Sequence, residues 1–118
     1  MKAYTDIEQS RKLVEILPIE SADLYYDRYG TPSFIDEYVS HSNIKNDKYK
    51  HLIPCWSLTA LFSVLPKGTD IIKEEADTEN EQYMCTVGIN DDIISIFASN
   101  PVDACTNMII KLNELKML

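Results

Sequence analysis

The sequence predicts a single α+β domain over residues 1–118, with N-terminal and central helices, an antiparallel meander of two or three strands, and a C-terminal helix packed on the sheet. Three observations predict this class. Residues 54–65 carry no charge, which is typical of a buried helix. Residues 82–97 show the period-two alternation of strands around a turn, and residues 100–115 show a capped apolar stripe. A chain of 118 residues has the size of one domain.

Two helices are expected near the N-terminus. Thr5 and Glu8 have the spacing of a capping box, which predicts a helix running to about Leu17. Pro18 ends this helix because its ring prevents the helix from continuing. Ser21 is expected to cap a short second helix over residues 21–26.

The middle of the chain contains the predicted central core element. Residues 30–33 have the composition of a turn, and residues 36–39 are expected to form one helical turn. The polar, lysine-rich residues 40–51 predict a mobile surface loop. Residues 54–65 then predict a buried helix, with Pro54 in its first turn and Pro66 ending it.

The strands are expected after this central helix. Residues 71–73 predict a short strand, and the acidic residues 74–81 predict a turn-like segment. In the next strand, apolar Tyr83, Cys85, Val87 and Ile89 alternate with Gln82, Met84, Thr86 and Gly88. Residues 90–92 predict a tight turn, and residues 93–97 are rich in the β-branched side chains that favour strands.

The C-terminal helix has the clearest signals in the chain. Asn100 is expected to be the N-cap, Pro101 occupies the first helical position, and Asp103 lies in the first turn, where a carboxylate suits the helix dipole. The helix has one apolar stripe, which consists of Val102, Cys105, Met108, Ile109, Leu112 and Leu115.

Charge and cysteine content limit the partners and the compartment. The net charge of −8 disfavours nonspecific binding to nucleic acid or to an anionic membrane. The chain has an odd number of cysteines, Cys55, Cys85 and Cys105, and no C-x-x-C pair. We therefore expect buried free thiols in a reducing cytoplasm. The first residues are polar, and the uncharged run 52–66 is too short to span a bilayer.

Three segments together resemble a known family. They are EILPIESAD at residues 15–23, PCWSLTAL at residues 54–61 and NPVDAC at residues 100–105. The sequence resembles a family of small uncharacterised proteins from Bacteroides-type bacteria, often found in phage-like or mobile-element contexts. The resemblance implies a bacterial, cytoplasmic setting, but no activity and no site residues. The acidic residues 74–81 have no counterpart in it.

Residues with catalytic or ligand-binding chemistry are few. A structural zinc site takes four ligands in close pairs, whereas His51 and Cys55 form one loose pair interrupted by Pro54, so no metal is expected. Cys55, His51 and Asp47 are the best catalytic arrangement available, although the apolar surroundings favour an inert thiol. The three glycines lie far apart, which excludes phosphate-binding loops, and no cofactor is expected.

Two clusters suggest surface contacts. Lys45, Lys48, Tyr49, Lys50 and His51 form a small basic cluster, interpreted as a solvated loop, and we expect no nucleic-acid partner. Aromatic residues are dense in the N-terminal third at Tyr25, Tyr26, Tyr29, Phe34 and Tyr38, and Trp56 is expected to lie near them. Because tyrosine combines an apolar body with a polar tip, we predict a protein interface at Tyr25, Tyr26, Tyr29 and Trp56. The alternative is half-buried packing over the core.

Three functional hypotheses follow. The favoured one is a non-enzymatic interaction or regulatory protein that binds another protein, or a second copy, through its tyrosine-rich or acidic surface. The alternative is a small enzyme or small-molecule-binding protein with a site near Cys55 and His51. A third hypothesis, an acidic nucleic-acid mimic, predicts that the carboxylates line one face.

Overall fold

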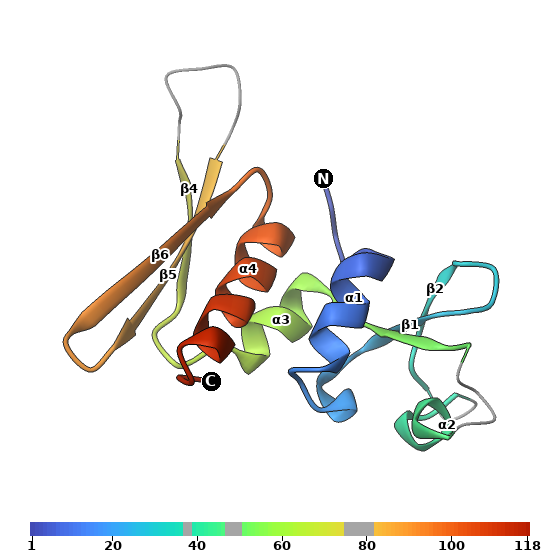
Figure 1. The fold of residues 1–118 in the computed structure, drawn as a ribbon. Coiled ribbons are helices and arrows are strands. Elements are labelled where there is room, and N and C mark those ends of the chain that lie inside the picture. Colours follow the sequence, from blue (N-terminus) through green and yellow to red (C-terminus); the bar gives the residue numbers. More distant parts are fainter. Residues whose placement is uncertain (37–38, 47–50, 75–81) are drawn as a thin grey trace.

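The structure is a computed structural model that describes residues 1–36, 39–46, 51–74 and 82–118. It has the predicted α+β architecture, but with two three-stranded antiparallel sheets rather than one meander. Figure 1 shows the sheets at opposite ends of the molecule, with helices α1 (Ile7–Val14), α3 (Leu58–Val64) and α4 (Pro101–Glu114) between them. The predictions that concern Tyr38, Asp47, residues 75–81, and Lys48, Tyr49 and Lys50 of the basic cluster lie outside the described residues.

The first helix begins one residue later than the sequence indicated. Asp6, not Thr5, is the N-cap of α1: its carboxylate accepts from the Gln9 amide at 2.7 Å, and Gln9 Oε1 accepts from the Asp6 amide at 3.1 Å. Thr5 is fully buried instead, and its Oγ1 lies 2.8 Å from Ser10 Oγ and accepts from the Trp56 amide. Long-range contact therefore moves the cap, and the helix ends at Val14, before Leu17.

The predicted second helix over residues 21–26 is wrong. A short 3₁₀ turn, η1 (Ile19–Ser21), leads into strand β1 (Leu24–Tyr26), the middle strand of the sheet β2-β1-β3. Strand β2 (Pro32–Phe34) follows a turn in which Gly30 has φ 76°, a conformation that favours glycine. Strand β3 (Ile53–Cys55) completes the sheet.

The central helix is shorter than predicted. Pro54 lies in β3, which is an edge strand and so tolerates a residue without an amide hydrogen. Ser57 is the N-cap of helix α3, and its Oγ accepts from the Ala60 amide at 3.2 Å, so Pro54 is not in the first helical turn. The Asp23 carboxylate accepts hydrogen bonds from the backbone amide and hydroxyl of Ser57, which fixes α3 against the first sheet.

The second sheet confirms the strand predictions. Strand β4 (Asp70–Glu74) pairs with β5 (Gln82–Ile89), which pairs with β6 (Asp92–Ala98), and all pairs are antiparallel. The β5–β6 turn holds Asn90 at φ 56°, a value that asparagine tolerates better than most residues. Tyr83, Cys85 and Val87 are buried, as the alternation predicted.

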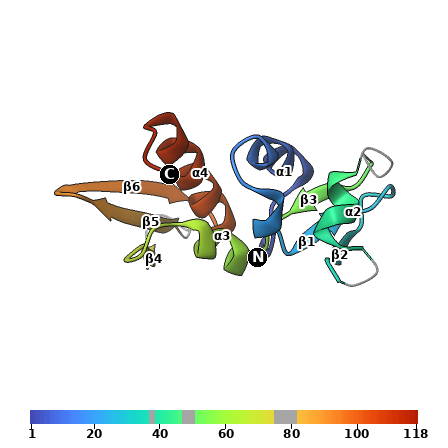
Figure 2. The ribbon, with the colours of Figure 1, turned by 90° about the horizontal axis from the view of Figure 1, so that it is seen from below.

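Helix α4 covers the inner face of this sheet and completes the main core (Figure 2). Asn100 caps it by accepting from the Asp103 amide at 2.8 Å, and Pro101 follows, as predicted. The stripe is fully buried from Val102 to Leu112, but Leu115 lies past the helix end and is 44% exposed. The core also contains Leu13, Trp56 and Leu61, so it joins α1, α3 and α4.

The polar segment 40–51 is not wholly a loop. Ser40 caps a short helix, α2 (His41–Lys45), whose Ile44 is buried and whose Lys45 is ion-paired with Glu20. Of residues 36–39, only Asp36 and Val39 are described, and the Asp36 amide donates to the Val39 carbonyl at 3.1 Å. In the described part of the chain, no helix is long and apolar enough to cross a bilayer.

Candidate functional site

The structure separates the predicted aromatic surface into core and surface residues. Trp56 is fully buried, and Tyr26 is 6% exposed with its hydroxyl donating to the Thr5 carbonyl at 2.6 Å. Burial raises the pKa of Tyr26. Both residues belong to the interior and offer no contact surface. Tyr25 is half-buried, and Tyr29 is exposed.

Exposed aromatic side chains occur at two places on the β1–β2 hairpin. Tyr29 is 84% exposed in the turn, and Phe34 is 75% exposed at the end of β2. The predicted interface therefore reduces to Tyr25 and Tyr29, with Phe34 added. Single exposed apolar residues are common on protein surfaces, so these side chains alone do not define a site.

Among the described residues, the region around Cys55 does not assemble an activated nucleophile. Cys55 is fully buried, and its Sγ donates to the Thr5 carbonyl at 3.4 Å and accepts from Thr5 Oγ1 at 3.6 Å. Burial raises the pKa of the Cys55 thiol, which keeps it protonated at neutral pH. His51 is exposed and lines a shallow surface groove with Arg11 and Glu15. The thiol is thus closed to a substrate.

The other cysteines form a buried pair between β5 and α4. Cys85 and Cys105 are both fully buried and free, as expected from the cysteine count. Their thiols share a hydrogen bond, which lowers the pKa of Cys85 and raises that of Cys105. Within the described residues, no group of three His, Cys, Asp or Glu side chains is placed to hold a metal ion.

An exposed apolar surface lies on the second sheet, opposite α4. The strand register places Ile72 of β4 beside Met84 of β5, and Met84 beside Phe97 of β6, so the three form one row across the sheet. Ile72 is 45% exposed, Phe97 is 51% exposed, and Met84 is half-buried. Ile93, on the same face, is 75% exposed. We call these four residues the open sheet face.

The charges on this face have one sign. Alternation along the strands places Asp70 and Glu74 of β4 on the same face as Ile72. The other side chains on this face are neutral: Gln82, Thr86 and Ser95, with Gly88 beside Ile93. The open sheet face is therefore an apolar row whose charged neighbours on the same face are carboxylates, whereas Lys73 of β4 lies on the opposite face.

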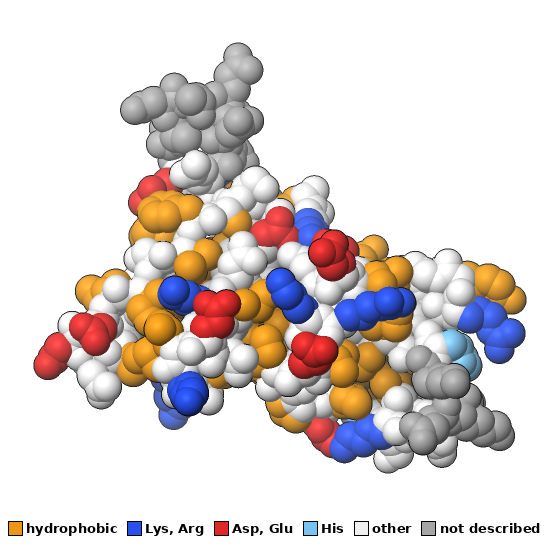
Figure 3. All heavy atoms as spheres, viewed as in Figure 1, with side chains coloured by type: hydrophobic (Ala, Val, Ile, Leu, Met, Phe, Trp, Pro, Cys, Tyr) orange, Lys and Arg blue, Asp and Glu red, His pale blue; other side chains and the backbone are white. Residues whose placement is uncertain are grey.

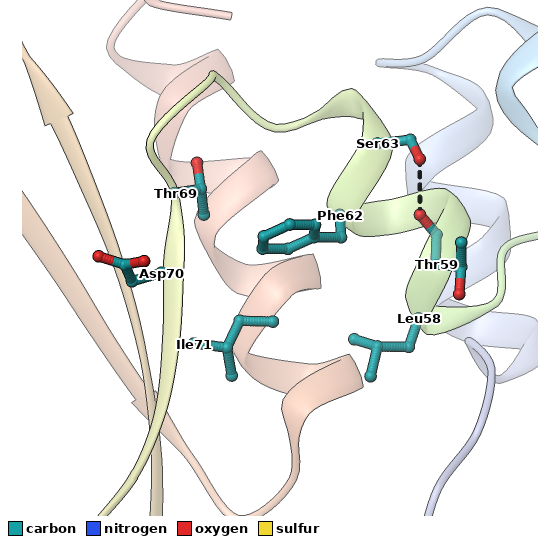
Figure 4. Close-up of a pocket in the computed structure, with 7 residues that line it drawn as sticks. All are labelled: Leu58, Thr59, Phe62, Ser63, Thr69, Asp70 and Ile71. Carbon is teal, nitrogen blue, oxygen red and sulfur yellow. Dashed lines mark hydrogen bonds between the residues drawn. The ribbon is translucent and has the colours of Figure 1, made fainter.

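A groove lies at the β4 edge of this sheet, between α3 and β4 (Figure 4). Its apolar walls are Leu58 and Phe62 from α3 and Ile71 from β4, which point toward one another. Thr59, Ser63, Thr69 and Asp70 complete the lining. The groove has a volume of about 500 Å³, within the range of ligand pockets. We call it the α3–β4 groove.

The chemistry of the α3–β4 groove is that of binding. Phe62 is 44% exposed, so its ring is available to a ligand. The Ser63 hydroxyl already donates to the Thr59 carbonyl at 2.8 Å within the helix. The Asp70 carboxylate points away from α3, toward the sheet, in Figure 4. The lining thus offers apolar contacts and hydroxyls, without a base positioned beside a nucleophile.

The sequence contained a signal for the open sheet face that the aromatic interpretation missed. Alternation already placed Met84 opposite the buried Tyr83, Cys85 and Val87. The same period makes Phe97 an outward residue, although it is large and apolar. A search for large apolar residues at outward-facing positions of neighbouring strands would have identified the open sheet face.

The comparisons with known proteins identify no relative. No family model matches the sequence, and no curated protein or solved structure is significantly similar to it. The chemistry of the surface is therefore the basis for a functional proposal. Figure 3 shows acidic and basic side chains interspersed over α1 and α4, so this face lacks the uniform carboxylate array that nucleic-acid mimicry predicts.

Proposed function

We propose that this protein is a non-enzymatic interaction protein that binds another protein through the open sheet face. The observation that carries the proposal is the row of Ile72, Met84 and Phe97, which crosses all three strands and stays accessible in the described structure. Contiguous exposed apolar residues rimmed by polar ones mark interaction sites. The three free, buried cysteines fit a reducing cytoplasm as the setting.

The energetics suit a specific contact of moderate affinity. Fully burying one large apolar side chain contributes roughly 1.5–3 kcal/mol. Ile72 and Phe97 are each about half exposed, so covering them would contribute roughly 1 kcal/mol apiece, with more from Ile93. Such a sum offsets only part of the association cost, so further contacts around the row are needed.

The partner's chemistry follows from the charges beside the row. Asp70 and Glu74 lie on the same face as Ile72, and the whole chain carries a net charge of −8. A partner surface with apolar side chains and a rim of Lys or Arg would match both features. Complementary charge steers association and disfavours acidic partners.

Site-specific crosslinking tests the proposal. A photo-crosslinking phenylalanine analogue is placed at position 97, and, as a matched control, at position 34, because Phe34 is also an exposed phenylalanine but lies on the other sheet. We expect a discrete crosslinked protein in native host cells from position 97, which disappears when Ile72→Lys is added. Identical products from the two positions, or none from position 97, would overturn the proposal.

A further inference from the structure

We propose that an extended segment of the partner adds to the second sheet as a fourth strand along β4, with its apolar side chains in the α3–β4 groove. This inference rests on the proposed function and specifies how the partner binds. The segment carries apolar residues on its groove side and Lys or Arg on the side of Asp70 and Glu74. Strand addition of this kind draws affinity from main-chain hydrogen bonds and specificity from pockets for alternate side chains.

The first support is the position of β4 in the sheet. Among the described strands, β4 pairs with β5 alone, so it is an edge strand. In an antiparallel pair, alternate residues direct their amide and carbonyl groups away from the partner strand. An edge of this kind is a template for another extended chain. The groove follows this edge at Thr69, Asp70 and Ile71.

The second support is the groove beside that edge. A strand added to β4 would direct alternate side chains to the same side of the sheet as Ile71. There, Leu58 and Phe62 of α3 form the opposite wall, and Phe62 is 44% exposed (Figure 4). A volume of about 500 Å³ is enough for a few apolar side chains. The groove thus supplies the pockets that strand addition uses.

The third support is the charge pattern of β4. Asp70, Ile72 and Glu74 share one face, in the order acidic, apolar, acidic. Opposite charges placed across two strands stabilise the pair, whereas like charges destabilise it. The residues of the added segment that face these three should therefore be basic, apolar and basic. Its apolar residue would extend the row of the open sheet face by one strand.

The same pattern argues against a second copy of this chain as the occupant. If two β4 strands paired antiparallel with Ile72 opposite Ile72, each Asp70 would lie opposite the Glu74 of the other copy. Four carboxylates would then face one another on one side of the new sheet. Both chains would also carry a net charge of −8. A basic segment from another protein avoids both repulsions.

The test uses peptides selected from a random 12-residue display library against the full chain. We expect the selected peptides to share alternating apolar residues with Lys or Arg on the other phase. In NMR titrations, the amide signals of Ile71 and Ile72 should shift. Phe62→Lys, at an exposed position, should weaken binding at least tenfold, and Asp70→Lys several-fold. Trp56 fluorescence checks that each variant is folded.

The matched control separates this inference from the proposed function. Phe97→Lys alters the open sheet face but not the groove, so peptide affinity should stay within about threefold of the wild type. The inference is overturned if no peptide is enriched, if the peptides are acidic, or if Phe62→Lys binds as the wild type does. If crosslinking from position 97 persists in those cases, the proposed function stands without strand addition.

Discussion

Removing the Ser21 hydroxyl should destabilise the protein, because it leaves a buried donor without its acceptor. The indole Nε1–H of the fully buried Trp56 donates to Ser21 Oγ at 2.9 Å, and Ser21 Oγ donates in turn to the Pro18 carbonyl at 2.6 Å. An unsatisfied buried polar group costs about 1–3 kcal/mol. With a urea m-value of about 1.5 kcal/mol/M, Ser21→Ala should lower the unfolding midpoint by roughly 0.7–2 M.

The assay is urea unfolding followed by fluorescence, since Trp56 is the only tryptophan and moves from core to solvent. Ser63→Ala is the matched control: its hydroxyl is exposed and bonds within α3, so the change should stay within about 0.5 kcal/mol. A double-mutant cycle with Trp56→Phe, followed by circular dichroism, should give a coupling near 1 kcal/mol. A Ser21→Ala midpoint equal to the wild type's would refute the reasoning.

Three further predictions concern stability and accessibility. Burial opposes ionisation of Asp103, but hydrogen bonds from Lys2, Gln9 and Asn100 outweigh it and lower the pKa of this carboxyl below its unfolded value. The ionised Asp103 therefore stabilises the fold above about pH 4, and this contribution is lost as the pH falls further. Asp103→Asn should cost about 1 kcal/mol at pH 7 and flatten the acid limb of a pH series of urea unfolding curves. Thr106 Oγ1 is buried without a hydrogen-bond partner in the described structure, so Thr106→Val should be neutral or raise thermal stability by up to about 1 kcal/mol, and a clear loss would contradict this. The three buried cysteines should react with a thiol reagent only after urea is added, and rapid reaction of the native protein would show that the core opens.

The second half of the fold was predictable because its signals are local. The alternation along β5 and the β5–β6 turn depend on residues a few positions apart. The cap of α4 is also local, since Asn100 and Asp103 are three residues apart. The distant bonds of Lys2 and Gln9 to the Asp103 carboxylate leave this cap in place, so period and cap were enough.

The first half was less predictable because distant partners decide its structure. Asp23 bonds with Ser57, 34 positions away, and the Trp56 amide bonds with Thr5 across 51 positions. These contacts select a strand at residues 24–26 and shift the cap of α1 to Asp6. Local patterns favoured a helix there, although paired tyrosines also suit a strand.

Only part of the candidate site could be predicted from the sequence. The period of β5 and β6 gives the outward phase of Met84 and Phe97. These outward side chains stay exposed because α4 covers only the other face of the sheet (Figure 2). That packing depends on the tertiary structure and not on the local sequence. The α3–β4 groove depends on how α3 lies beside β4, and no short-range pattern encodes that placement.

The bonds of the N-terminal segment have a consequence for synthesis on the ribosome. Lys2 donates to Asp103 across 101 positions at 2.9 Å, and Gln9 donates to the same carboxylate across 94 positions. At a translation rate of about 5–20 residues per second, the first residues wait roughly 5–20 s for this partner to be made. During that interval, α1 lacks the last helix it packs on. We therefore expect the nascent chain to stay open to proteases and chaperones until α4 leaves the exit tunnel.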